Sequence, residues 1–112
     1  MVQLLQLPER DPRPRSLFFT RGELSEMLSV YSRRVISGEW RDYAIDHRDG
    51  LAMFSIFRHT LDRPLFAIVK APAPVGRPAE YILMQGAERL ARSGTLAEIL
   101  ATLEGRPRLV ET

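Results

Sequence analysis

The chain has 112 residues but no cysteine, only two histidines and only one lysine. The lack of cysteine excludes disulfides, thiolate zinc sites, iron–sulfur clusters and cysteine nucleophiles, and it is compatible with a reducing compartment. No apolar run approaches the length of about 18 residues that a membrane-spanning helix needs, and the opening segment is too short for a signal peptide. We therefore expect a cytoplasmic protein that has no membrane association.

Complete catalytic and phosphate-binding motifs are also missing. The sequence contains no G-x-S-x-G nucleophile elbow, no G-x-G-x-x-G fingerprint and no P-loop. His47 and His59 fall near opposite ends of a predicted strand pair, about 20 Å apart, which is too far to share a metal ion. Asp42 and Asp46 would be about 13 Å apart in a strand, too far to share a proton. We expect no cofactor, no metal and no enzymatic activity.

What the chain does contain is an ordinary globular composition with a strong preference for arginine. Hydrophobic residues make up 45% and charged residues 27%, which favours one folded domain. Fifteen of the sixteen basic residues are arginine, so the sequence pI is about 9.5 although the net charge is only +2. Arginine binds phosphate bidentately, so the preference is compatible with nucleic-acid binding, but a GC-rich genome produces the same preference.

Proline and glycine divide the chain into segments. Residues 1–15 end in PERDPRPR, which favours a flexible Pro/Arg-rich arm, and residues 106–112 form a tail. The single domain is therefore expected at 16–105. It opens with a brief apolar run, after which Thr20 and Glu23 form a capping-box pattern that predicts the start of a helix. The predicted buried stripe of this helix is Leu24, Met27, Leu28, Tyr31 and Val35.

The helix is expected to end at Gly38, and five extended segments follow. They are residues 40–47, 51–58, 65–71, 81–85 and 88–92. Asp49-Gly50 between the first two is a strong hairpin signal, and Thr95 with Glu98 caps a last helix that ends at Gly105. The predicted fold is α+β, a five-stranded antiparallel meander with two helices on one face, in the order (β)-α-β-β-β-β-β-α. The bracketed strand is the apolar run at 16–20.

Three stretches of the sequence carry a resemblance to known proteins: ELSEMLSVYSRRV, GEWRDYAID and FSIFRHTLDRPLFAIVK. Their charged and aromatic residues recur in the order found in an uncharacterised domain-of-unknown-function family of small alphaproteobacterial proteins. The chain resembles this family over about residues 17–104. The family has no assigned activity, cofactor or catalytic residues, so the resemblance implies no chemistry.

The segment GEWRDYAIDH, residues 38–47, concentrates aromatic and charged side chains. Strand alternation would put Trp40, Asp42, Ala44 and Asp46 on one face and Arg41, Tyr43, Ile45 and His47 on the other. We expect a mainly structural role for this segment. Trp40 would pack at a half-buried corner between helix and strand, Tyr43 and Ile45 would enter the core, and Arg41 would pair with a nearby carboxylate.

Residues 51–58 and 65–71 are apolar on both strand faces, although the helices can cover only one. Either these are central strands of a small core, or a second layer covers them. We favour protein–protein contact and homodimerisation through the outer face or an edge of the sheet. The alternative is a nucleic-acid-binding regulator, although carboxylates interleave with its arginines. The candidate interaction surface consists of Trp40, Arg41, Asp42, Arg33, Arg34, Met53, Phe57 and Arg58.

Overall fold

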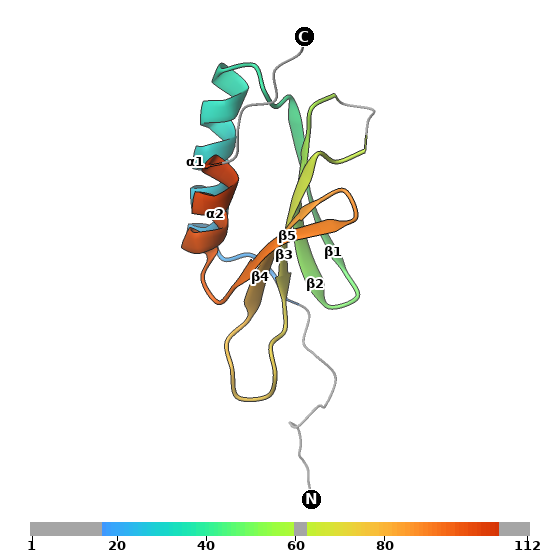
Figure 1. Cartoon of the computed structure of the whole chain (residues 1–112). Coiled ribbons are helices and arrows are strands. Elements are labelled where there is room, and N and C mark those ends of the chain that lie inside the picture. Colours follow the sequence, from blue (N-terminus) through green and yellow to red (C-terminus); the bar gives the residue numbers. More distant parts are fainter. Residues whose placement is uncertain (1–16, 60–62, 106–112) are drawn as a thin grey trace, which may run out of the picture.

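The structure is a computed structural model that describes residues 17–59 and 63–105. Its elements are α1 (Arg21–Ile36), β1 (Asp42–Arg48), β2 (Leu51–Phe57), β3 (Phe66–Ala71), β4 (Glu80–Gln85), β5 (Glu88–Ser93) and α2 (Leu96–Glu104). The strands form one antiparallel sheet in the order β1-β2-β3-β4-β5, and both helices lie on one side of it (Figure 1). The predicted α+β meander is confirmed. The predicted arm and tail lie outside the described residues.

Local sequence signals set the ends of α1. Thr20 Oγ1 accepts a hydrogen bond from the Glu23 amide at 3.1 Å, and Glu23 Oε1 accepts one from the Thr20 amide at 2.7 Å. The predicted capping box is therefore present. At the other end, Gly38 adopts a φ of 85°, the left-handed conformation that commonly follows the last turn of a helix.

The buried face of α1 agrees with the predicted stripe at four of its five positions. Met27 and Val30 are buried, whereas Val35 is 38% exposed. Leu24, Leu28 and Tyr31 pack against the core as predicted. The prediction was wrong for Val35, and it missed Val30 and the inward-facing polar side chains of Glu23 and Arg34, which make the contacts described below.

Two predicted strand boundaries were also wrong. Residues 17–20 form no strand; Phe19 is buried directly before the helix cap and fills the core instead. The first strand begins at Asp42 and not at residue 40, so alternation does not apply to Trp40. Trp40 lies in the corner after α1 and is only 2% exposed, on the core side of the sheet and not on the outer face with Asp42.

The hairpin turns follow the glycine positions. Asp49 and Gly50 have φ values of 55° and 78°, the pair of positive angles that a two-residue turn requires, so the predicted hairpin between β1 and β2 is confirmed. Gly86, with a φ of 60°, makes the predicted return from β4 to β5. Residues 60–62, within the predicted turn before β3, lie outside the described residues.

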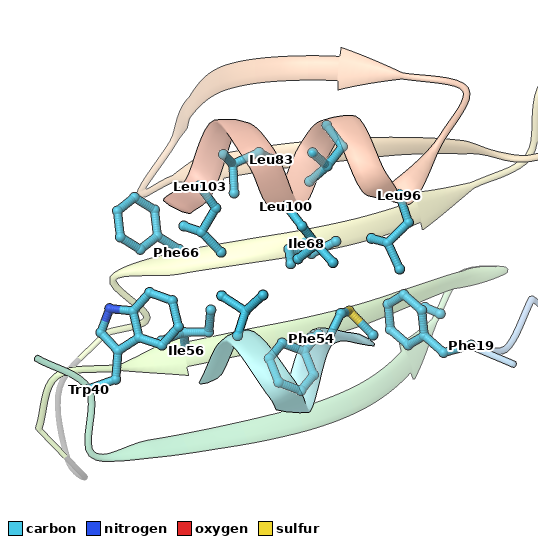
Figure 2. Packing of buried hydrophobic residues seen from close by; sticks show 14 residues of the cluster. Phe19, Trp40, Phe54, Ile56, Phe66, Ile68, Leu83, Leu96, Leu100 and Leu103 are labelled. Atoms are coloured by element: carbon cyan, nitrogen blue, oxygen red, sulfur yellow. The ribbon is translucent and has the colours of Figure 1, made fainter. Parts of the chain in front are cut away.

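The helix-covered face of the sheet forms a single hydrophobic core (Figure 2). Phe54, Ile68 and Leu83, from the three central strands, have no exposed surface. Side chains of this size stabilise a domain by about 1.5–3 kcal/mol each when buried. Tyr43 stacks on Phe54 at 5.3 Å between ring centroids, but it is 38% exposed because β1 is an edge strand. The expectation that Tyr43 and Ile45 enter the core is therefore wrong in part, because both lie on the core side of the sheet but Ile45 is also 37% exposed.

Candidate functional site

The sheet surface opposite the helices, here called the open face, carries a continuous apolar area. No helix or strand within residues 17–59 and 63–105 covers it (Figure 1). It is hollowed by a depression of about 640 Å³ whose apolar floor comes from the three central strands. The floor residues are Leu51, Met53, Ala67, Val69, Ile82 and Met84. Such a surface suits contact with another protein chain.

The register of the sheet arranges the open face in rows that cross all the strands. Antiparallel partners share a face, so one row reads Asp46, Met53, Val69, Ile82 and Arg92 from β1 to β5. An acidic residue ends this row at one edge of the sheet and a basic residue ends it at the other.

The next row towards the β1–β2 turn has the opposite polarity. Arg48 pairs with Leu51 at the β1 edge, and Ala71 pairs with Glu80 near the other edge. Glu80 Oε1 also lies 3.3 Å from Arg92 Nε, in a pair whose arginine side chain is 57% exposed. The apolar centre of the open face is therefore flanked by charges at both edges.

The structure separates the residues of the predicted interaction surface into three places. Met53, Phe57 and Asp42 lie on the open face. Met53 and Phe57 are four positions apart in β2, and Asp42 of β1 pairs with Phe57. Trp40 lies in the core, where it is only 2% exposed. The other four residues are arginines on the helix side or near the end of the sheet.

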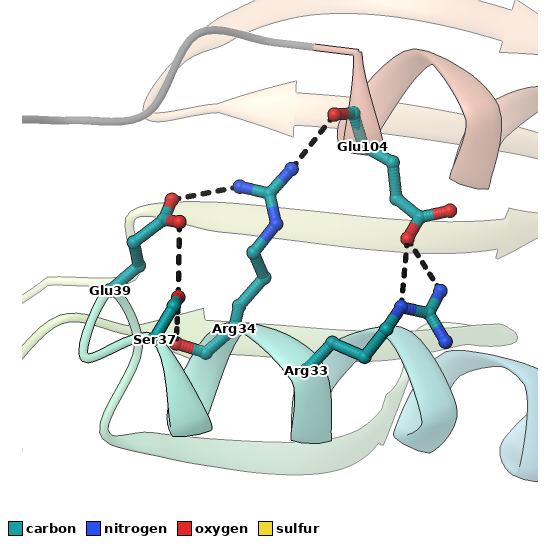
Figure 3. A network of polar contacts seen from close by, with 5 residues as sticks. All are labelled: Arg33, Arg34, Ser37, Glu39 and Glu104. Atoms are coloured by element: carbon teal, nitrogen blue, oxygen red, sulfur yellow. Dashed lines mark hydrogen bonds and ion pairs between the residues drawn. The ribbon is translucent and has the colours of Figure 1, made fainter.

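Two of these arginines join the C-terminal ends of the helices (Figure 3). Arg33 Nε donates to Glu104 Oε2 at 3.2 Å. Arg34 donates to Glu39 Oε1 and to the Glu104 carbonyl, both at 2.8 Å, and its guanidinium carbon lies 5.5 Å from the centre of the Trp40 ring. Arg33 thus holds α1 to α2, and Arg34 holds α1 both to α2 and to the corner before β1.

The remaining two arginines lie by a separate hollow. Arg41 and Arg58 line a depression of about 440 Å³ together with His59, and Trp40 contributes part of its wall. Arg41 is exposed, and its amide donates to the Phe57 carbonyl at 2.9 Å. The carboxylate of Glu39, which lay close enough in sequence to pair with Arg41, instead pairs with Arg34. This hollow is the one place where the predicted arginines face solvent together.

Sequence reasoning missed a buried polar cluster around Lys70. Its Nζ donates to Glu23 Oε1 and to the Phe18 carbonyl, both at 2.9 Å. Tyr81 donates its hydroxyl proton to Glu23 Oε2. The cluster ties the start of α1 to β3 and β4. Its only sequence signal was a lone lysine in the apolar strand FAIVKA, because Glu23 lies 47 residues from Lys70 and 58 residues from Tyr81.

The titration of this cluster follows from its contacts. Burial raises the pKa of Glu23, but hydrogen bonds from Tyr81, the Thr20 amide and Lys70 together outweigh it, so the pKa is lowered below 4.5. Burial, followed by the bond to Glu23, raises the pKa of Tyr81 to about 12. Glu23 is therefore ionised and Tyr81 neutral at physiological pH. Both states suit a structural tether, in which each polar group has a partner.

A family model described as protein of unknown function (DUF2794) matches residues 17–100. The chain belongs to this family. The match runs from the residues before α1 into α2 and so includes the whole sheet. The resemblance inferred from three stretches of sequence is thereby confirmed. No curated protein and no solved structure matches the chain.

Other kinds of site find little support in the part of the DUF2794 chain that the structure describes. Within it, no group of three or more histidine, aspartate or glutamate side chains is placed to hold a metal ion. Among the same residues, no helix has the length and hydropathy needed to cross a membrane. The open face is the candidate site because of its apolar floor and the charges at its edges.

Proposed function

We propose that this DUF2794 chain is a non-enzymatic protein-binding module of the bacterial cytoplasm and that it forms a homodimer through its open face. The observation that carries the proposal is the apolar floor across β2, β3 and β4, opposite the helices. Met53, Val69 and Ile82 remain partly exposed there, although neighbouring strands pack on both sides of each. A second protein layer would remove this area from water. The absence of cysteine supports a reducing compartment.

Sedimentation velocity of the native chain and of two valine variants tests this function. Val69→Asp puts a carboxylate in the apolar floor, whereas Val75→Asp makes the same change in the β3–β4 loop, where the side chain is fully exposed. We expect the native chain and Val75→Asp to be dimers and Val69→Asp to be a folded monomer. Met53→Lys, on the neighbouring strand, should reproduce the Val69→Asp result. A native chain that stays monomeric at high concentration would refute the proposal.

The alternative function, a nucleic-acid-binding regulator, is supported by the hollow that Arg41, Arg58 and His59 line. Arg33 and Arg34 contribute less to it than their sequence suggests, because their guanidinium groups bind carboxylate and carbonyl oxygens of the chain itself. Phosphate contacts would make binding to duplex or single-stranded DNA fall steeply with salt, and Arg41→Gln would reduce the slope. Absence of binding at low salt would eliminate this alternative.

A further inference from the structure

We propose that two copies stack open face to open face about a two-fold axis parallel to the strands, so that the β1 edge of each copy lies over the β5 edge of the other. This inference rests on the proposed homodimer and specifies its geometry. It follows from the order of charged residues along the rows of the open face. The pairing register of the strands sets this order.

A two-fold axis along the strands keeps each row at its level and reverses its direction. The row that begins with Asp46 and ends with Arg92 then meets its own reverse, so each carboxylate lies over a guanidinium. In the adjacent row Glu80 belongs to β4 and so comes over Leu51 of β2, while Arg48 comes over the end of β5. The apolar residues of β2, β3 and β4 meet one another in the centre. Both charges at the ends of the first row are matched by one operation, which is the property that a self-complementary interface requires.

A two-fold axis perpendicular to the strands fits less well. It would place β1 over β1, and an axis through the first row would bring Asp46 over Asp46 and Arg92 over Arg92. Shifting this axis between the two rows would move it off the central row of the apolar floor and leave Arg92 without a carboxylate opposite it. The axis parallel to the strands keeps the two apolar floors centred on each other and opposes Asp46 with Arg92 at both edges.

The dimensions of the face set the strength of the contact. Four strand spacings of about 4.8 Å and six residues of about 3.3 Å give a face of roughly 19 by 20 Å. Two such faces have an area of roughly 760 Å² in total, below the size of stable specific interfaces and in the range of weak, transient ones. The dimer is therefore expected to dissociate at accessible concentrations, so that changes of affinity are measurable.

Charge reversal at the two ends of one row tests the axis. Asp46→Arg would face Arg92 of the other copy twice in each dimer, and Arg92→Asp would face Asp46 twice. Each variant alone should dimerise about tenfold or more weakly than the native chain, because like charges are opposed at both edges. Mixed together, the two variants should form a heterodimer of near-native affinity, since every opposed pair is again of opposite sign. Sedimentation velocity with one variant fluorescently labelled measures all three affinities.

Matched controls reverse charges on the other side of the molecule. Glu26 and Arg21 are exposed on α1, so Glu26→Arg and Arg21→Asp should leave the dimer affinity unchanged. A native dimer that Val69→Asp dissociates but neither row variant weakens would overturn the axis and leave the proposed function standing. Two weakened variants that fail to rescue each other when mixed would overturn it as well. A monomeric native chain would overturn both proposals.

Discussion

The two faces of the sheet have the same strands but opposite surroundings. On the helix side, Phe54, Ile68 and Leu83 are completely buried, and the ring centroids of Trp40 and Phe66 lie 6.3 Å apart. On the open face, side chains of similar hydrophobicity remain partly exposed around a hollow of about 640 Å³. Apolar sequence on both sides of a strand therefore identifies a surface that needs covering, but it does not say what covers it.

The two faces also differ in how they use charge. On the helix side, Lys70 and Glu23 form a buried pair with side-chain exposures of 11% and 14%. On the open face, Arg92 and Glu80 form a pair with exposures of 57% and 29%. The charged groups of a buried ion pair need all their hydrogen-bond partners within the fold. The groups of an exposed pair can instead form ion pairs with another molecule. The charges of the open face are thus suited to recognition and those of the helix side to holding the fold together.

The sharpest way to test this difference is to truncate two adjacent residues of β3. Ile68 faces the core and Val69 the open face. Ile68→Ala should lower the free energy of unfolding by about 3–4 kcal/mol, because it leaves a cavity among packed side chains. Val69→Ala should lower it by less than about 1 kcal/mol when the chain is monomeric. Urea denaturation at low protein concentration measures both, and equal losses would contradict the assignment of faces.

The second largest effect is expected at the corner between α1 and β1. Trp40→Ala should lower the free energy of unfolding by about 3 kcal/mol, since the indole is buried against Phe66 and covered by the Arg34 guanidinium. Trp40→Phe keeps much of the apolar area and is the matched control, with an expected loss of about 1 kcal/mol. A loss below about 1 kcal/mol for the alanine variant, seen in a thermal melt, would indicate that the ring does not support the fold.

The sequence predicted features that depend on near neighbours and missed those that depend on distant ones. The Thr20–Glu23 capping box and the Asp49-Gly50 turn are local, and both are present. The second role of Glu23, as the partner of Lys70, joins positions 47 residues apart and has no local signal. Trp40 was assigned to the wrong face because side-chain alternation applies only within a paired strand, and β1 does not begin until Asp42.

The candidate surface divides in the same way. Met53 was correctly assigned to the face opposite Phe54, because alternation along one strand is a local property. The charge rows were not visible in the sequence, because a row exists only once the register of all the strands is known. Arg33 and Arg34 appeared available for phosphate because their partner on α2, Glu104, is about 70 residues away.

A smaller effect, on pH dependence, is expected from the buried cluster of the helix side. The folded pKa of Glu23 lies below its unfolded value of 4.5, so its stabilising contribution is complete above that value and is lost as the pH falls through the folded pKa. Glu23→Gln should lower the free energy of unfolding by about 2 kcal/mol at pH 7, since it weakens hydrogen bonds to a charged group. The difference from the native chain should shrink in acid. Urea titrations at a series of pH values measure it, and a constant difference would contradict the lowered pKa.

The smallest expected effect is the difference in stability loss between alanine variants of two consecutive arginines at the end of α1. The side chain of Arg33 is 56% exposed and that of Arg34 only 15%, although both bind Glu104. Arg34→Ala should lower the free energy of unfolding by about 1–2 kcal/mol, because it removes a partly buried pair and the cover over Trp40. Arg33→Ala should lower it by less than about 0.5 kcal/mol, because water and salt screen an exposed pair.

Ionic strength provides the control for this last comparison. Raising the salt concentration should abolish the small contribution of Arg33 and leave most of that of Arg34, since mobile ions screen exposed charges far more than buried ones. Chemical denaturation by urea, which adds no ions, is the suitable measurement. If Arg33→Ala proved as destabilising as Arg34→Ala in high salt, exposure would not be what distinguishes the two pairs. The same reasoning would then fail for Arg92 and Glu80, whose exposed pairing is what leaves the open face able to exchange partners with a second copy.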